Sequence, residues 1–392
     1  MKTIAHLLPN YNPFPPIYPA GTELRVAQVS QRQSRYRPVV VCGGFPGQPS
    51  KENLDAMEIR RIHFGRIYRR LFQKITRLDP WPFGHRMWQC IREENAVLLH
   101  IHNEPKLLAM LAPYLRETPM PMVVHIANDK PIPRELIPLV TRWVACSHFM
   151  AKWLQEHVGV PADRIEVIYT GVDITGRPPR WTISVTEQAE RRARWGVGPE
   201  DYVFLFAGRL VKEKGVAEML DAFERLRAER PVKLLVAGNV RESKDPANEK
   251  AVYGQAVAAR MAKMGGVRWV GSLHPDAMHD FLLVGDAFLL PSLWHDPFPT
   301  VMLEAACAGL PILAGRRGGI TEFLDGCPGL GFLEHPEDPN ELAAMMARLA
   351  DGAVSGLDAG RWLRARIEAN FDWSRVTRDF ENLYDHTLGA NK

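Results

Sequence analysis

The segment Tyr202-Val-Phe-Leu-Phe-Ala-Gly-Arg-Leu-Val-Lys-Glu-Lys-Gly215 joins an apolar run to a basic loop. Its first five residues are almost continuously apolar, as strands of a parallel sheet are when helices cover both faces. Gly208 follows and lets the chain turn at the carboxyl end of the strand. The segment therefore predicts a buried parallel strand whose loop lies at the sheet edge where open α/β folds bind ligands.

Similar apolar runs alternate with helical patterns on both sides of this segment. After it, runs at 233–237, 267–270, 287–290 and 311–314 are separated by helical patterns near 215–228, 250–264, 276–284, 299–308 and 338–350. Before it, a first strand at Lys2 and runs at 39–42, 97–102, 122–126 and 143–146 are interrupted by helical patterns at 23–33 and 106–114. This order is typical of doubly wound α/β domains.

A break separates the two series. Residues 174–200 contain Pro178-Pro179 and the charged stretch 187–194. We therefore expect two domains in tandem, residues 1–176 and 198–370, which face one another across a cleft that holds the ligand.

Composition narrows the class of protein. The chain has 392 residues, 46% of them hydrophobic and 24% charged, which is typical of a globular protein. Its five cysteines include no Cys-x-x-Cys pair, which argues against a zinc ribbon or a disulfide framework and favours a reducing cytoplasm. No apolar run approaches the roughly 20 residues that span a bilayer. We expect a cytoplasmic location.

The charge is distributed unevenly. Residues 1–176 carry a net charge of +7 and the remainder −3, so the first half is expected to attract anions. No nucleic-acid-binding signature is present, and nucleic acid is therefore not expected as a partner.

A basic segment, residues 60–77, offers one interpretation of this charge. It holds seven Lys or Arg residues and no acid. Its apolar residues recur at helical spacing and are Phe64, Ile67, Tyr68, Leu71, Phe72 and Ile75. Such a helix can lie on an anionic membrane surface. Alternatively, its apolar face packs in the core and its basic face is solvated.

The basic loop carries two candidate ligand-binding cations. Arg209 and Lys214 suit a diphosphate at the sheet edge, although the same loop could simply be solvated. Gly318 and Gly319, after another strand, either bring the backbone close to a ligand or make a tight turn. The chain contains no Asp-x-Asp, so a metal held by that motif is not expected.

Two carboxylates lie in the segment 295–311. Pro299 suits a first helical turn, so Asp296 precedes a short helix and Glu304 lies within it. A rise of about 1.5 Å per residue separates them by roughly 12 Å. A glycosidase pair needs about 5–9.5 Å. This separation suits instead an extended ligand with hydroxyls at both ends and an anion between them.

The helix start would bind that anion. The backbone N–H groups of Phe298, Thr300 and Val301 would face it. The alternative is a solvated helix with Asp296 as its cap.

Taken together, these segments resemble the retaining glycosyltransferases of family 4, which have the GT-B fold of two Rossmann-like domains. Ala20-Gly21-Thr-Glu-Leu is similar to the family's loop after the first strand, and Val144–Ser147 to Tyr169–Asp173 is similar to the end of its first domain. Phe371–Ser374 to Tyr384 resembles the closing helix, which in this family packs back on the first domain. For this chain that implies a helix over 371–390.

The resemblance implies roles for the second domain. Arg209 and Lys214 would neutralise a nucleotide diphosphate without metal. Glu304 would accept hydrogen bonds from the ribose, Asp296 would contact the donor sugar, and Leu273 would lie beside the base.

In the first domain, Gly21 would let the backbone approach the phosphates, and His125 matches the family's active-site histidine. Two positions depart from the family pattern: Asp296 stands where the family usually has Glu, and Pro299 where it has Gly, which removes one N–H from the anion site.

We therefore predict a retaining, metal-independent hexosyltransferase without a resident cofactor. Its donor would be a UDP- or GDP-hexose. Its acceptor would be a lipid-linked saccharide that is used to make cell-surface polysaccharide. The reaction would take place at the inner face of the cytoplasmic membrane. Two alternatives stay open: a nucleotide-sugar-binding subunit of an assembly complex with weak catalysis, and an enzyme that hydrolyses the nucleotide sugar.

Overall fold

The computed structural model describes residues 1–17, 21–68, 70–72, 79–241, 243, 245 and 247–389. The chain folds into two compact units. Unit 1 comprises Met1–Gly171 and Trp373–Lys392, and unit 2 comprises Val172–Asp372. Residues 174–200, where the sequence indicated a break, belong to unit 2 and contain the helix α6 (Val185–Arg194), whose N-cap Ser184 accepts a hydrogen bond from the Glu187 N–H.

Unit 1 is built on an eight-stranded sheet in the order β3-β4-β2-β1-β5-β6-β7-β8. Its strands are β1 (Lys2–Leu7), β2 (Tyr36–Gly43), β3 (Lys51–Leu54), β4 (Met57–Ile62), β5 (Ala96–His102), β6 (Met122–Ile126), β7 (Arg142–Ala145) and β8 (Ile165–Val167). All neighbouring pairs are parallel except β3 and β4, which form an antiparallel hairpin. The apolar runs quoted above are buried because helices cover the central parallel strands.

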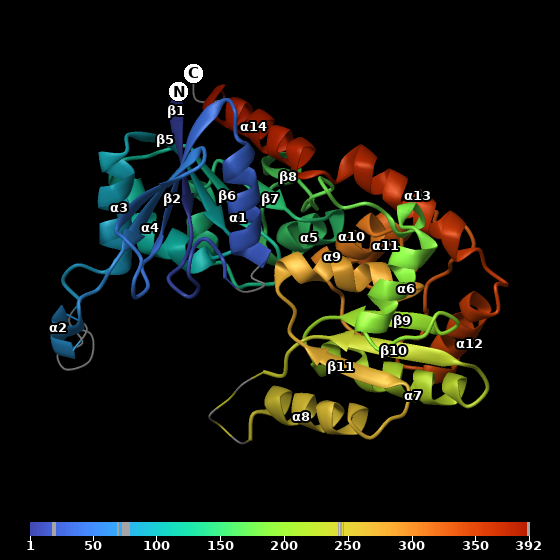
Figure 1. The fold of residues 1–392 in the computed structure, drawn as a ribbon. Helices are drawn as coiled ribbons and strands as arrows, with labels where there is room; N and C mark the ends of the chain where they lie inside the picture. The colour runs from blue at the N-terminus through green and yellow to red at the C-terminus, as the bar shows by residue number, and fades with distance from the viewer. Residues whose placement is uncertain are drawn as a thin grey trace. The chain divides into compact units, whose positions relative to one another are not determined.

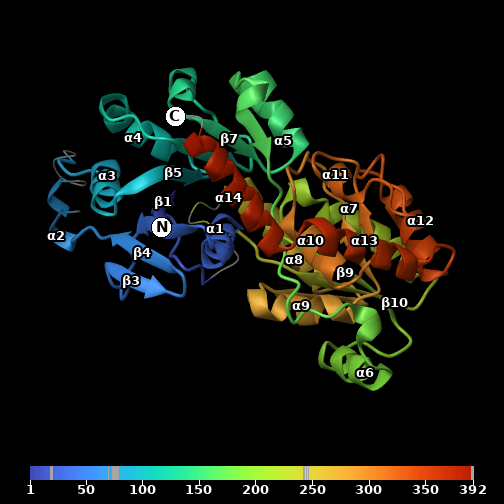
Figure 2. The ribbon, with the colours of Figure 1, turned by 90° about the horizontal axis from the view of Figure 1, so that it is seen from above.

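The longer helices of unit 1 pack on this sheet. They are α1 (Gly21–Arg32), α3 (Phe83–Glu93), α4 (Pro105–Glu117), α5 (His148–Trp153) and α14 (Trp373–Gly389). α14 lies beside α1 (Figure 1; Figure 2) and buries Phe380 and Tyr384 against Ile4 and Leu98. The C-terminal helix α14 is thus part of the core of unit 1, although it lies far from α1 along the sequence.

The basic segment 60–77 is not one continuous helix. Residues 60–62 lie in β4, and the first helical residues are those of the short α2 (Arg66–Tyr68). The helix cannot begin earlier because β4 is paired with the strands β2 and β3. The spacing of apolar residues within the segment does not reveal this strand pairing. Ile75 and Arg69 lie outside the described residues.

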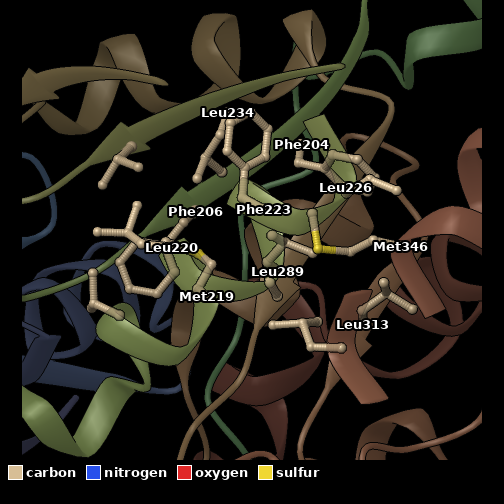
Figure 3. Close-up of a cluster of buried hydrophobic side chains, with 14 of the residues drawn as sticks. Phe204, Phe206, Met219, Leu220, Phe223, Leu226, Leu234, Leu289, Leu313 and Met346 are labelled. Atoms are coloured by element: carbon tan, nitrogen blue, oxygen red, sulfur yellow. The ribbon is translucent and has the colours of Figure 1, made fainter. Parts of the chain in front are cut away.

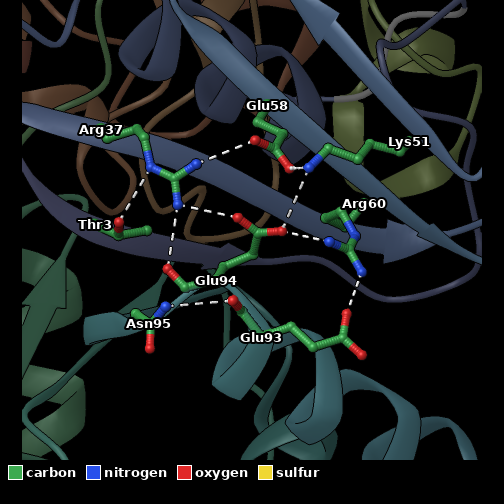
Figure 4. Close-up of polar contacts among 8 residues, drawn as sticks. All are labelled: Thr3, Arg37, Lys51, Glu58, Arg60, Glu93, Glu94 and Asn95. Carbon is green, nitrogen blue, oxygen red and sulfur yellow. Dashed lines mark hydrogen bonds and ion pairs between the residues drawn. The ribbon is translucent and has the colours of Figure 1, made fainter.

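Ion pairs account for the charge at the start of that segment (Figure 4). Arg60 pairs with Glu93 and Glu94, at the end of α3. Arg37 joins the same group through Glu94, at 3.0 Å, and through Glu58, at 3.1 Å. These contacts hold the β4 edge of the sheet to α3, so Arg60 is not available to a membrane surface.

Unit 2 is built on a five-stranded parallel sheet in the order β11-β10-β9-β12-β13. The strands are β9 (Tyr202–Ala207), β10 (Val232–Ala237), β11 (Val267–Gly271), β12 (Ala287–Leu290) and β13 (Ile312–Ala314). The remaining helices of the unit are α7 (Val216–Arg227), α8 (Glu249–Met261), α9 (Pro275–Val284), α10 (Thr300–Cys307), α11 (Ile320–Leu324), α12 (Pro339–Ala350) and α13 (Gly356–Asn370).

A large apolar cluster of unit 2 lies between the sheet and the helices α7, α8 and α12 (Figure 3). Phe204 and Phe206 of β9 meet Phe223 of α7, and Met346 of α12 closes the cluster. All four side chains are at most 1% exposed. Burial of each contributes about 1.5–3 kcal/mol, which fixes β9 and hence the loop that follows it.

Among the described residues, no helix is both long enough and apolar enough to cross a membrane.

Candidate functional site

Backbone hydrogen bonds join three loops at the carboxyl ends of the unit 2 strands. The Leu293 N–H, in the loop after β12, donates to the carbonyl of Glu213, in the loop after β9, at 3.0 Å. The Gly319 N–H, in the loop after β13, donates to the carbonyl of Asp296 at 2.8 Å. The residues expected to bind a ligand are therefore carried by loops that constrain one another.

Two glycines allow the loops to approach this closely. Gly238, after β10, has φ +153°, and a Cβ built on it would lie 1.8 Å from the carbonyl oxygen of Gly208. Gly215, with φ +68°, would place a Cβ 2.0 Å from the carbonyl oxygen of Pro291. Any side chain at either position would force the backbone apart.

The two cations of the basic loop have different surroundings. The Lys214 ammonium forms an ion pair with the carboxylate of Asp296, which is 6% exposed, and lies 5.9 Å from the centre of the Trp294 ring. Arg209 is exposed and forms no ion pair within the part of the chain that the structure describes. The structure thus brings Lys214 and Asp296 together, a contact that the sequence did not predict.

The helix α10 begins beside Asp296. Pro299 is its N-cap and supplies no side-chain cap. Phe298 is 7% exposed and stacks on Phe371, with 5.9 Å between ring centres. Thr300 is exposed and Val301 half-buried, so the first turn of the helix is reachable from solvent.

The other end of α10 is firmly held. Arg364 of α13 donates to the carbonyl of Cys307 at 2.6 Å, and the Arg180 N–H donates to the carbonyl of Ala308 at 2.9 Å. A buried cation at a helix C-terminus is favourable because it meets the negative end of the helix dipole. These contacts fix the direction in which the N-terminus of α10 points.

Glu304 lies in the middle of α10. It keeps some exposed surface as a residue, but protein atoms surround its carboxyl group. This burial raises the pKa of Glu304 to about 7, and the nearby Arg177 opposes the rise. This carboxyl group therefore holds its proton at a higher pH than an ordinary Glu side chain does.

The remaining expected residues lie where their strands end. Leu273 is half-buried in the loop after β11. Gly21 opens α1 in unit 1, and a Cβ built on it would meet no atom within 4 Å, so the backbone is open there. Ala20, which precedes it, lies outside the described residues.

His125 is the last but one residue of β6 and is fully buried. The guanidinium of Arg25, on α1, contacts its ring at both nitrogens, with 3.1 Å to Nε2 and a shorter contact to Nδ1. The family resemblance predicted a role for His125, whereas no sequence pattern pointed to Arg25.

Three further histidines, missed in the sequence, lie beside them. His6 of β1 meets His102 of β5 at 3.0 Å, and His100 of β5 meets the Tyr384 hydroxyl at 2.7 Å. The alternation His100-Ile-His102 was the available signal, because residues two apart in a strand share a face.

This three-histidine cluster has side-chain nitrogens within 4.8 Å of one another, close enough for a metal ion. Burial lowers the pKa of each ring, and His6 is also hydrogen-bonded to Gln33 at 3.3 Å. These contacts join β1 and β5 to α1 and α14, which is a structural role for neutral histidines.

Each unit also contains a cavity. That of unit 1, about 550 Å³, lies at the carboxyl ends of β2 and β4. Its lining includes Asn10, Gly44, Phe45, Phe64, Asp79 and Phe83. That of unit 2, about 690 Å³, is bounded by Tyr202 and Asp286, at the amino ends of β9 and β12, and so lies at the sheet edge opposite to Arg209.

Family models match both units. The model described as Glycosyltransferase Family 4 matches residues 20–175, and the model described as Glycosyl transferases group 1 matches residues 187–355. Together they span most of the chain and all of the expected site residues.

Individual proteins are similar over its length. Lipopolysaccharide 1,2-N-acetylglucosaminetransferase of Salmonella typhimurium is 28% identical over 375 residues, which cover 94% of each chain. Glycogen synthase of Mycobacterium tuberculosis is 31% identical over 62% of this chain and 53% of its own.

Solved structures share the fold. A sucrose-phosphate synthase from Thermosynechococcus elongatus matches with a TM-score of 0.79 at 17% identity over 100% of both chains. Anabaena Alr3699/HepE in complex with UDP and glucose matches with a TM-score of 0.74 at 17% identity, over 97% of this chain and 99% of its own.

The raised pKa of Glu304 predicts a pH-dependent cost to stability. The folded protein holds this proton more tightly than the unfolded chain, so ionisation destabilises the fold as pH rises from about 4.5 to 7. Glu304→Gln should therefore stabilise unit 2 at pH 8, on the order of 2 kcal/mol, and have little effect at pH 4.5. Thermal unfolding at both pH values measures this. Glu190→Gln, on the exposed side of α6, is the control, and an equal gain at both pH values for Glu304→Gln would contradict the assignment.

Proposed function

The chain belongs to the group 1 glycosyltransferases of family 4 and has the GT-B fold, and on that premise we propose that it transfers a hexose from a UDP- or GDP-hexose to a saccharide acceptor of a cell-surface glycan. Enzymes of this family transfer a sugar from a nucleotide sugar with retention. The proposal adds the hexose, the nucleotide, the acceptor and independence from metal.

One observation carries the proposal: Arg209, Lys214 and the open first turn of α10 are held at one sheet edge by loops that are hydrogen-bonded to each other. Two cations and a helix N-terminus suit a diphosphate. Phe298, Thr300 and Val301 supply the backbone N–H groups of that turn.

The proposed chemistry follows from where charge develops. When the bond between the sugar and the diphosphate breaks, negative charge grows on the leaving phosphate. Arg209, Lys214 and the α10 N–H groups stabilise that charge, and the acceptor hydroxyl attacks from the same face while the phosphate takes its proton. Glu304 accepts hydrogen bonds from the ribose, and Leu273 lies beside the base.

To bind Lys214, the donor must displace Asp296 from the ion pair between these two residues. A diphosphate that binds Lys214 competes with Asp296 for the same ammonium. The released carboxylate of Asp296 then accepts hydrogen bonds from the sugar hydroxyls. Because Asp is one methylene shorter than Glu, it reaches less far, and this length contributes to the choice of sugar.

In unit 1 we propose that His125 contacts the transferred sugar and that Gly21 allows the backbone to approach the phosphates. The unit 1 cavity, lined by three Phe residues together with Asn10 and Asp79, is the candidate acceptor site. Aromatic faces with a few polar groups suit a saccharide. The similarity to the Salmonella lipopolysaccharide N-acetylglucosaminetransferase supports a cell-surface glycan.

Transfer itself is the decisive test. The protein is screened by thermal shift against GDP-mannose, UDP-glucose, UDP-GlcNAc and dTDP-sugars, where a ligand at about 100-fold over its Kd contributes about 2.7 kcal/mol. The stabilising donor, radiolabelled in the sugar, is then incubated with lipid extracts. We expect labelled lipid product and its loss in Glu304→Ala.

The outcomes separate the alternatives. A stabilising donor without transfer would indicate a binding subunit of an assembly complex, an alternative that the departures at Asp296 and Pro299 keep open. Release of free sugar in water alone would indicate a hydrolase. Absence of any stabilising nucleotide sugar would contradict the donor site.

A matched pair of variants tests the basic loop. Arg209→Ala removes an exposed cation that we place on the diphosphate, and should weaken nucleotide binding about 10- to 100-fold, the equivalent of a charged hydrogen bond. Lys212→Ala removes the same charge from an exposed residue of the same loop and should change it less than about 3-fold. Isothermal titration calorimetry with the free nucleoside diphosphate measures the affinity of both variants. Equal losses of affinity would show that only the overall positive charge of the loop contributes to binding.

An anionic membrane is the proposed partner of the exposed part of segment 60–77. Ile67 is 82% and Leu71 44% exposed, beside Arg66 and Arg70. Exposed apolar side chains with adjacent cations suit a headgroup layer. Arg66→Gln with Arg70→Gln should weaken binding to phosphatidylglycerol vesicles several-fold in a sedimentation assay.

The control for this assay is Lys106→Gln with Arg116→Gln, which removes two exposed cations from α4 of the same unit. Equal binding of both double variants would show that the segment does not contact the membrane.

A further inference from the structure

Arg25 is a buried cation without an acidic partner. It lies on α1 and is 6% exposed, and it makes no ion pair with any carboxylate in the described ranges. Glu23, two residues earlier, is engaged by Asn12 at 2.9 Å. A buried charge without a counter-charge is costly, so the fold must gain from what the guanidinium does.

The contact that Arg25 does make is with His125. Its Nη1 lies across the ring edge that carries both nitrogens, at 3.1 Å from Nε2 and closer to Nδ1. A guanidinium can only donate hydrogen bonds, so the ring must present a lone pair to it. The contact therefore requires a neutral imidazole.

Among the residues that the structure describes, the groups found around His125 carry no negative charge. His100 and His102 face it from β5, Phe380 of α14 lies 6.4 Å away between ring centres, and Cys146, after β7, lies near Arg25. Burial lowers the pKa of His125 well below its ordinary value, and Arg25 and then His100 lower it further. Arg25 is the charged member of this group.

We propose that Arg25 is a positioning residue for His125, holding the imidazole neutral and fixing its rotation at the carboxyl end of β6. This inference rests on the function proposed above, in which His125 contacts the transferred sugar. It explains why a buried guanidinium without an acidic partner lies at this position. A neutral ring whose lone pair faces Arg25 keeps one N–H to donate to a sugar hydroxyl, and its fixed rotation decides which hydroxyl it meets.

Nuclear magnetic resonance tests the contact without any substrate. In the full-length protein labelled with 13C at histidine Cε1, the His125 signal, assigned with His125→Asn, should not titrate between pH 5 and 8.5. In Arg25→Met its titration midpoint should rise by about one pH unit or more, because a like charge is removed. Arg32→Met, also on α1, should leave the signal unchanged.

Arg25→Lys keeps the positive charge but loses the planar guanidinium. It therefore distinguishes the effect of the charge on the protonation of His125 from the effect of the guanidinium on the orientation of the ring. It should keep the wild-type titration. A His125 signal that titrates near pH 6.5 in the wild type, or that is the same in wild type and Arg25→Met, would overturn the inference.

Kinetics then measure the effect on transfer. Arg25→Met should acquire a loss of kcat toward acidic pH that the wild type lacks, with the donor KM changed less than kcat. The losses from Arg25→Met and His125→Asn should not multiply in the double variant, because Arg25 acts through His125. Multiplying losses would overturn a positioning role. If no variant and no wild type transfers sugar, the proposed function fails, while the magnetic resonance result still decides whether Arg25 controls His125.

Discussion

The hydrogen bonds between the loops at the carboxyl edge of unit 2 are the constraint on which the candidate site depends. The Glu213 carbonyl and the Asp296 carbonyl each accept from a neighbouring loop, and Gly238 lets the backbone pass against Gly208. Because backbone groups make these contacts, the positions of Lys214 and Asp296 follow from the course of the chain. A backbone that is held in place loses little conformational entropy when a ligand binds, which lowers the cost of binding at the site that we propose.

Charge is handled differently in the two units. In unit 2 the Lys214 ammonium is neutralised by Asp296, and Arg209 stays exposed. In unit 1 the buried guanidinium of Arg25 has the imidazole of His125 as its partner. In the function that we propose, a diphosphate exchanges with Asp296 for the Lys214 ammonium. We propose that the contact in unit 1 keeps the His125 ring neutral.

Much of the fold could be predicted because the strands of both units are continuous apolar runs, which only burial explains. The hairpin β3–β4 was missed because its residues are charged and its strands are held by pairing and by Arg60 with Glu94. The helix α6 was missed because half of its residues are charged and it has few apolar residues to mark a buried face. The candidate site residues were predicted from local motifs and from the family resemblance, whereas the Lys214–Asp296 and Arg25–His125 contacts join residues 82 and 100 positions apart.

The sequence by itself determined the fold class, the family and the loops that carry Arg209, Asp296 and Glu304, because apolar periodicity and short motifs are local properties of the chain. Only the tertiary structure decided which of these groups are paired, that the pKa of Glu304 is raised and that Arg25 contacts His125. Desolvation and ion pairing depend on every atom around a group, and those atoms come from segments that the sequence leaves far apart.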